Sequence, residues 1–114
     1  MPIPEQIRLD AEKVLDEYCK DAVPEHAQDK LRLGYISKGM AITLFEMRPA
    51  FRRPSKWHST DVARFRFNKT SNEWTLYWRD RNHKWHIYER IHPKQNFNGL
   101  FQEVLDDPTG IFWG

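Results

Sequence analysis

The chain of 114 residues has only one cysteine, Cys19. One thiol excludes an internal disulfide and a thiolate-rich metal site, and it is typical of a cytoplasmic protein. Long apolar runs are missing as well, because the uncharged hydrophobic stretches last a few residues and a membrane span needs about 20. Proline and glutamate stand near the N-terminus, where a signal peptide has an apolar run. We therefore expect a soluble, cytoplasmic protein that is not exported and has no membrane partner.

Sequence signatures of cofactors and catalysis are also missing. There is no glycine-rich phosphate loop and no dinucleotide-binding fingerprint. His83 and His86 lie three residues apart, but no cysteine or carboxylate stands at a conventional metal-ligand spacing from them. The remaining acid–base candidates, His58, Asp61 and Asp80, form no recognisable triad or carboxylate pair. We therefore expect no cofactor and no metal site, and the sequence identifies no catalytic residue.

Large aromatic side chains, in contrast, are plentiful. Five Trp, seven Phe and four Tyr make up 14% of the chain. This content is too high for a disordered segment, although the mean hydropathy of -0.81 alone is typical of one. The length suits one hydrophobic core, so we expect residues 1–114 to form a single domain.

The charges are unevenly distributed along the chain. Residues 1–29 carry 3 Lys and Arg against 8 Asp and Glu, residues 30–94 carry 15 against 5, and residues 95–114 carry none against 3. The middle segment therefore has a net charge of +10, although the whole chain has only +2. This distribution predicts that an anionic partner binds the middle of the chain.

The spacing of apolar residues predicts the order of helices and strands. A first helix starts at Pro4 and Glu5 and ends before Pro24, and from residue 31 the period changes from 3.6 to 2. We expect five strands, over residues 31–36, 40–47, 62–68, 73–79 and 84–91, and a second helix between Pro93 and Asp107. This order predicts an α+β fold in which the N-terminal and C-terminal helices pack on one face of a five-stranded, mainly antiparallel sheet. The apolar tail at residues 111–113 is expected to pack against the body.

The hairpin turns decide which side chains share a face of the sheet. We expect a four-residue loop at residues 69–72 and a two-residue turn at residues 81–82. One face of the last three strands is then apolar, and the other is basic and aromatic. The residues predicted to bind an anion on that second face are Arg64, Arg66, Tyr77, Arg79, Lys84, His86 and Tyr88. Arg90 is expected to pair with Glu73, whereas nothing neutralises Arg79 and Lys84.

This basic and aromatic face has three interpretations. Arginines that meet phosphates beside rings that stack on bases are typical of surfaces that bind single-stranded RNA or DNA. The second interpretation is an ordinary solvated face, because Arg, Lys, Thr and Tyr are common at outward strand positions. The third is a face covered by the proline-containing connection or by the C-terminal tail.

The long connection at residues 48–60 has two interpretations of its own. It interleaves four cations with Phe51 and Trp57, which suits an arm that contacts phosphates. Alternatively, the two rings anchor a proline-stiffened strap to the core.

Three sequence segments resemble one known family. They are the run from Leu76 to Tyr88, the ending from Asp107 to Gly114, and Val62-Ala63-Arg64-Phe65-Arg66. In these segments the chain is similar to the domain of unknown function 3024 family, and the likeness covers nearly the whole chain. The resemblance implies a bacterial cytoplasmic protein and carries no activity, cofactor or catalytic residue with it.

We therefore expect a small binding module for an anionic ligand, with single-stranded nucleic acid as the favoured partner. Two alternatives remain open from the sequence. One is a protein-interaction module in which the acidic first helix or the tail meets a partner or a second copy. The other is a metal-independent ribonuclease that uses His86.

Overall fold

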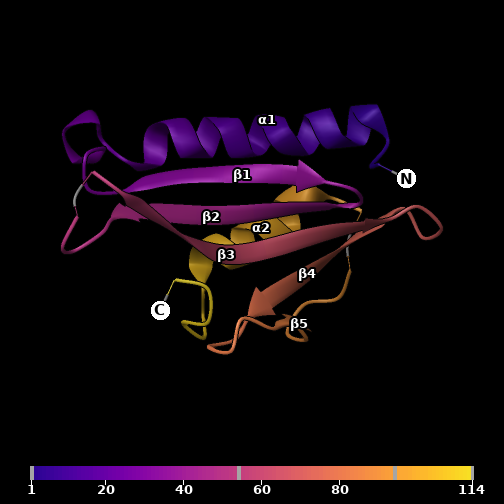
Figure 1. The fold of residues 1–114 in the computed structure, drawn as a ribbon. Coiled ribbons are helices and arrows are strands. Elements are labelled where there is room, and N and C mark those ends of the chain that lie inside the picture. Colours follow the sequence, from indigo (N-terminus) through magenta and orange to yellow (C-terminus); the bar gives the residue numbers. More distant parts are fainter. Residues whose placement is uncertain (1, 54, 94, 114) are drawn as a thin grey trace.

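Five consecutive strands form one antiparallel sheet, and their spatial order is their order in the chain (Figure 1). The computed structural model describes residues 2–53, 55–93 and 95–113. The strands are β1 (Arg32–Lys38), β2 (Ala41–Pro49), β3 (Trp57–Asn68), β4 (Glu73–Arg79) and β5 (Trp85–Ile87). The helix α1 (Glu5–Ala22) and the short turn η1 (Glu25–Ala27) precede the sheet, and α2 (Phe97–Asp106) follows it. The predicted α+β class is confirmed.

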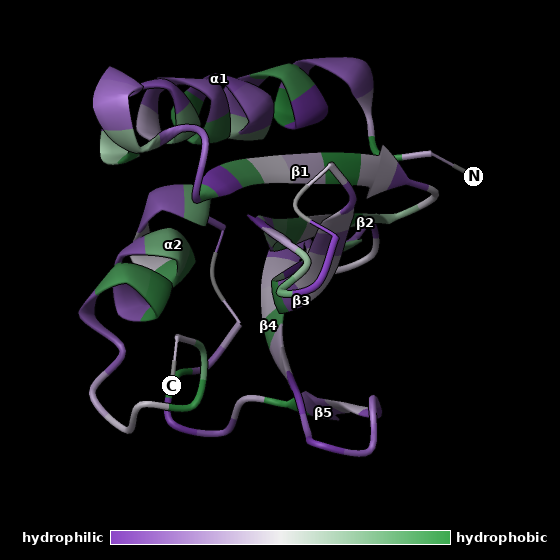
Figure 2. Ribbon diagram, turned by 60° about the vertical axis from the view of Figure 1, so that its left-hand side comes forward, coloured by the Kyte–Doolittle hydropathy of each residue, from purple (hydrophilic) through white to green (hydrophobic). Residues whose placement is uncertain are grey.

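Both helices lie on the same side of the sheet (Figures 1 and 2). The apolar stripe of α1 buries Ala11 and Leu15, and α2 buries four apolar residues, Phe97, Leu100, Phe101 and Val104. Each helix therefore presents one apolar stripe to the sheet. In the described part of the chain, no helix combines the length and apolar character needed to cross a membrane.

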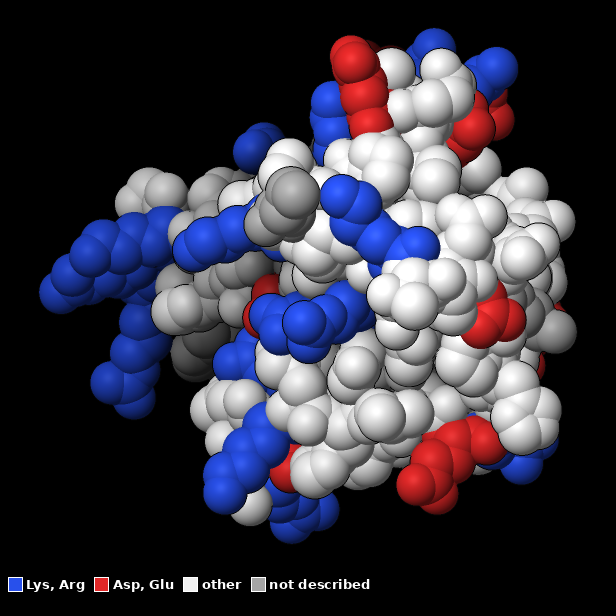
Figure 3. Space-filling model, turned by 90° about the vertical axis from the view of Figure 1, so that its right-hand side faces the viewer, with Lys and Arg blue, Asp and Glu red and all other residues white. Residues whose placement is uncertain are grey.

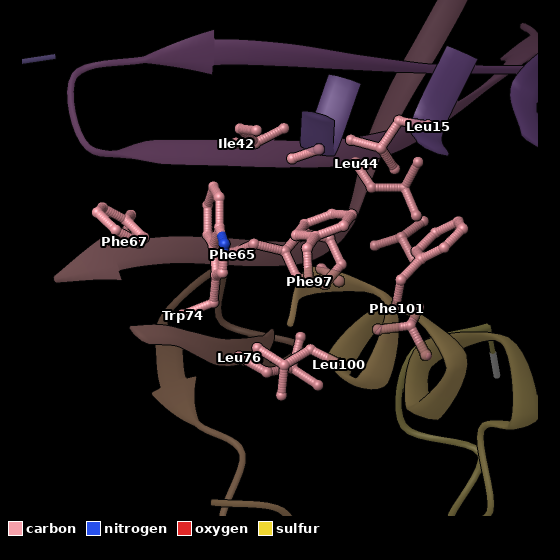
Figure 4. Close-up of a cluster of buried hydrophobic side chains, with 14 of the residues drawn as sticks. Leu15, Ile42, Leu44, Phe65, Phe67, Trp74, Leu76, Phe97, Leu100 and Phe101 are labelled. Carbon is pink, nitrogen blue, oxygen red and sulfur yellow. The ribbon is translucent and has the colours of Figure 1, made fainter. Parts of the chain in front are cut away.

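The core is an aromatic cluster between the sheet and α2 (Figure 4). Phe65 of β3 is fully buried, and its ring centroid lies 4.7 Å from that of Phe97 and 6.3 Å from that of Phe101. Trp74 of β4 packs 5.2 Å from Phe97 in the same cluster. Alternation along a strand places every second side chain on this side. The residues before and after Phe65 must therefore face the other way.

Polar contacts join α1 to the edge strand β1. The hydroxyl of Tyr35 donates a hydrogen bond of 2.6 Å to Asp16, and the hydroxyl of Ser37 donates one of 2.6 Å to Glu12. Burial, followed by the hydrogen bond to Asp16, raises the pKa of Tyr35 above its usual range. The helix thus packs along the edge strand of the sheet.

The C-terminal tail packs against α2, as expected from its apolar residues. Asp107 ends the helix in the left-handed region, with φ of 40°, and its carboxylate accepts the backbone N–H groups of Phe112 and Trp113. Phe112 is buried against Tyr88, and the indole of Trp113 donates to the carbonyl of Val104. The described part of the tail therefore lies on the helix side of the sheet.

The β3–β4 hairpin has the predicted register. Asn68 pairs with Glu73 across a four-residue loop, and Phe65 pairs with Leu76. The predicted long connection was wrong, because β2 continues to Pro49 and β3 already begins at Trp57. Pro49 fits a strand end, where its missing N–H costs no ladder bond. Only residues 50–56 form the loop.

The predicted register between β4 and β5 was wrong by one residue. Arg79 pairs with Trp85 instead of Lys84, and β5 ends at Ile87. The cause is Asp80, whose carboxylate accepts the backbone N–H groups of Asn82 (2.8 Å) and Lys84 (3.0 Å). These bonds close a five-residue loop over residues 80–84 in place of the expected two-residue turn. Every side chain of β5 therefore faces the side opposite to the predicted one.

Replacing Phe65 tests the importance of the aromatic core. We expect Phe65→Ala to lower the free energy of unfolding by about 3–5 kcal/mol, because a fully buried ring leaves a cavity beneath α2. Phe51→Ala is the matched control, since that ring is 97% exposed and its removal should change stability by less than about 0.5 kcal/mol. Urea unfolding followed by circular dichroism measures both. Equal decreases in the two variants would contradict the assignment of the core.

Candidate functional site

The side of the sheet that faces away from both helices is here called the outer face. Its members, as placed by the strand register, are Arg32, Gly34, Ile36, Lys38, Ala41, Thr43, Phe45, Met47, Pro49, Trp57, Ser59, Asp61, Arg64, Arg66, Asn68, Glu73, Thr75, Tyr77, Arg79, Trp85 and Ile87. Arginine and lysine outnumber Asp and Glu on this face. In Figure 3, Lys and Arg gather on the left of the picture, which is the side of the molecule that faces the reader in Figure 1.

Two adjoining hollows open on the outer face near the β1–β2 turn. One has a volume of about 460 Å³ and is lined by Lys38, Arg64, Arg66, Tyr77 and Trp85, among others. The other has about 400 Å³, shares Arg66 and Tyr77 with the first, and continues along β3 and β4. Lys38 and Arg66 are exposed, and neither makes an ion pair or a side-chain hydrogen bond with any residue that the structure describes. The hollows therefore hold two cations that no carboxylate neutralises.

Arg64 is held in place by two neighbours on the outer face. Its Nε donates a hydrogen bond of 3.3 Å to the hydroxyl of Thr43, and its guanidinium lies 4.3 Å from the centroid of the Trp85 ring. A cation over an indole ring is attracted by about 0.5–1 kcal/mol at an exposed site. Arg64 is thus fixed between β2 and β5, with its charge at the wall of the hollow.

Arg79 is neutralised, contrary to the prediction from the sequence. Its guanidinium lies 2.7 Å from the carboxylate of Asp61, and its Nε is buried without a hydrogen-bond partner among the described residues. Asp61 faces outward because the register of β2 and β3 shifts between Leu44 and Phe45, which leaves one extra residue in β3. The ion pair therefore competes with any anion for Arg79.

The structure brings together Arg64, Arg66, Tyr77 and Arg79 of the predicted set on the outer face. Lys84 lies in the exposed loop before β5 and outside the strand. The one-residue shift in register moves His86 and Tyr88 to the helix side.

His86 and Tyr88 have partners on the helix side. His86 stacks on Trp78 with a centroid distance of 4.7 Å, and its Nε2 lies 2.6 Å from Asp80. Tyr88 is 3% exposed and donates a hydrogen bond of 2.6 Å to Glu103. Burial, and then this hydrogen bond, raises the pKa of Tyr88. Arg90 also lies near Glu103, at 3.9 Å, and not beside Glu73 as predicted.

Trp85 and Lys38 belong to this site, although the sequence did not predict them there. The apolar side chain of Trp85 fits the inward pattern of the strand and so predicts a core position. The sequence feature that indicates the outward position of Trp85 is Asp80, two residues before Asn82. An aspartate at the start of a turn can accept backbone N–H groups and so lengthen the loop. Lys38 was missed because β1 extends two residues beyond the predicted end at residue 36.

Other chemistry has little support in the described residues. Among them, no three His, Cys, Asp or Glu side chains come close enough together to hold a metal ion. Burial, with the nearby charge of Asp16, raises the pKa of the Cys19 thiol to about 11. The thiol is therefore protonated at neutral pH and is a poor nucleophile.

Asp80 should have a strongly acidic carboxyl group. The hydrogen bond with His86 and the backbone N–H groups of Lys84 and Asn82 lower its pKa to about 2. Because the folded pKa is lowered, the stabilising effect of the carboxylate is complete above its usual pKa of about 4 and disappears as pH falls through about 2.

We therefore expect the stability difference between the native protein and Asp80→Asn to shrink as pH falls from about 4 to about 2. Urea unfolding at several pH values measures it. In His86→Ala, NMR titration should find the pKa of Asp80 closer to its usual value. A stability difference that does not vary with pH would contradict this explanation of the turn.

Comparison with known proteins identifies one family. The model of the domain of unknown function DUF3024 matches residues 3–114. No curated protein matches the chain, and no solved structure does. The family match spans the helices, the sheet and both hollows of the outer face. The chain therefore belongs to the DUF3024 family.

Proposed function

We propose that the protein binds single-stranded RNA or DNA through the outer face of its sheet. The observation that carries the proposal is the pair of hollows in which Lys38 and Arg66 lie beside Tyr77 and Trp85, with no ion pair to any carboxylate among residues 2–53, 55–93 and 95–113. Cations that contact phosphates next to rings that stack on bases form the usual combination in proteins that bind single strands.

Three cations, Lys38, Arg64 and Arg66, line the same hollow of the outer face. Lys38 and Arg66 lie level with each other on either side of Ala41, so their backbones are two strand spacings apart, roughly 10 Å. Arg64 follows on the same face of β3. At physiological ionic strength exposed charges farther apart than about 8 Å are largely screened, so the repulsion between Lys38 and Arg66 is weak. A phosphate bound in the hollow between them would be attracted by cations of both strands.

The tail and the connection support the proposal because neither covers the outer face. The described tail packs on α2, and in Figure 1 the sheet lies in front of α2, α1 runs along β1, and no described segment crosses the sheet. The geometry favours binding over RNA cleavage, because His86 lies on the opposite side of the sheet from the proposed phosphate contacts.

Replacing the two unpaired cations should weaken binding in a salt-dependent way. For a single strand, the slope of log affinity against log salt changes by about 0.7 for each phosphate that the protein neutralises. We therefore expect the slope to become shallower by about 0.7 for Arg66→Ala and by about 1.4 for Arg66→Ala with Lys38→Ala. Fluorescence titration with an unlabelled single-stranded oligonucleotide at several salt concentrations measures the slope.

Lys13→Ala is the matched control, because it removes one exposed positive charge from α1 on the other side of the molecule. It should leave the slope unchanged. Equal effects of Arg66→Ala and Lys13→Ala would show that binding follows net charge and not the outer face. Absence of binding by the native protein would contradict the proposal itself.

Removing the carboxylate that pairs with Arg79 should have the opposite effect. Asp61→Asn keeps the shape of the side chain and releases the guanidinium that Asp61 now holds at 2.7 Å. We expect tighter oligonucleotide binding and a salt slope that is steeper by about 0.7, because Arg79 is then free to neutralise one more phosphate. The same titration measures it, with the thermal melting curve as a check of folding. Weaker binding by a folded Asp61→Asn variant would exclude Arg79 from the interface.

A further inference from the structure

The loop between β2 and β3, residues 50–56, exposes a large aromatic ring to solvent. Phe51 is 97% exposed. The other large apolar side chains that are exposed in the described chain, Leu9, Ile36 and Ile87, are aliphatic and only 43–58% exposed. Single exposed apolar side chains are common on protein surfaces, so the ring indicates a ligand only together with the charges beside it.

The loop has an internal structure that keeps the ring away from the core. The backbone N–H of Ala50 donates to the carbonyl of Lys56 at 2.8 Å, and that of Lys56 donates to the carbonyl of Arg53 at 2.9 Å. These bonds close the loop on itself. The interpretation of Phe51 as an anchor to the core was therefore wrong. Trp57 also packs on the outer face, with the guanidinium of Arg32 4.1 Å from its ring centroid.

The charged residues near Phe51 in the sequence are all positive. Arg52, Arg53 and Lys56 are exposed, and residues 47–60 contain no Asp or Glu. The nearest preceding carboxylate, that of Glu46, already lies 3.7 Å from Arg48. Arg52, Arg53 and Lys56 make no ion pair with a carboxylate that the structure describes, and a ring beside three such cations is complementary to a base flanked by phosphates. Insertion into a membrane generally uses a broader apolar surface than one ring.

We propose that this loop is a second contact element for single-stranded nucleic acid, in which Phe51 stacks on a base and Arg52, Arg53 and Lys56 contact phosphates. The inference rests on the proposed function of the outer face. Thr43, which is level with Arg64, and Pro49, the last residue of β2, are six residues apart, so the loop begins about 20 Å from the hollows. A short oligonucleotide fills the hollows alone, and a longer one reaches the loop as well.

Binding of a trinucleotide and of an oligonucleotide of about 16 nucleotides tests the inference. We expect Phe51→Ala to weaken binding of the long oligonucleotide at least about fivefold, since removing one base–aromatic stack has this effect or a larger one. Binding of the trinucleotide should be unchanged, as should the salt slope, because stacking releases no counterions. Phe51→Tyr keeps a stacking ring and should restore binding, and Leu9→Ala is the control for an exposed apolar residue on α1.

The outcomes separate this inference from the proposed function. If the native protein binds neither oligonucleotide, the proposed function fails. If it binds both, and Phe51→Ala binds the long one as well as the native protein does, only the role of the loop is overturned. Vesicles of phosphatidylserine and phosphatidylcholine provide a second probe. Vesicle binding that requires Phe51, with no effect of Phe51 on the long oligonucleotide, would assign the loop to a membrane surface and overturn the inference.

Discussion

The packing of Phe65 against the two rings of α2 is the contact on which the rest of the structure depends. Phe65 lies on the central strand, and its burial between Phe97 and Phe101 fixes which side of β3 faces the helices. Because strand residues alternate, this choice also sends Arg64 and Arg66 to the outer face. The hydrophobic core and the basic surface thus have one common cause. Both helices pack on one side of the sheet, and the cations and aromatic rings of the other side are accessible.

The sequence was sufficient for those parts of the fold in which apolar periodicity and turn length agree. Phe65 and Phe67 of β3 face Leu76 and Trp74 of β4 across a loop of ordinary length, so the pattern alone fixes the register. At β5 the pattern is ambiguous, because Trp85 and His86 both begin a plausible inward series. The decision there rests on hydrogen bonds from the backbone of the loop to the carboxylate of Asp80. A single side chain thus reverses the faces of the last strand.

The residues of the candidate site also fall into those that the sequence predicts and those that it does not. The β3 and β4 members could be predicted from the sequence because the core fixes their orientation. The pairing of side chains from different strands could not be predicted in this way. Asp61 pairs with Arg79 because a one-residue irregularity of β3 opposite Phe45 turns the Asp61 side chain outward. The exposure of Phe51 could not be predicted from the sequence either, because an aromatic ring between two prolines fits an anchor to the core equally well. Local bonds within the loop decide between these two interpretations.

In the proposed function, the outer face and not the helix side contacts single-stranded nucleic acid. NMR mapping of backbone amide shifts during addition of an oligonucleotide distinguishes the two sides. We expect shifts at Lys38, Arg64, Arg66, Tyr77 and Trp85, with the amides in the middle of α1 and α2 unchanged. Shifts confined to the helices, or none at saturating oligonucleotide, would contradict it.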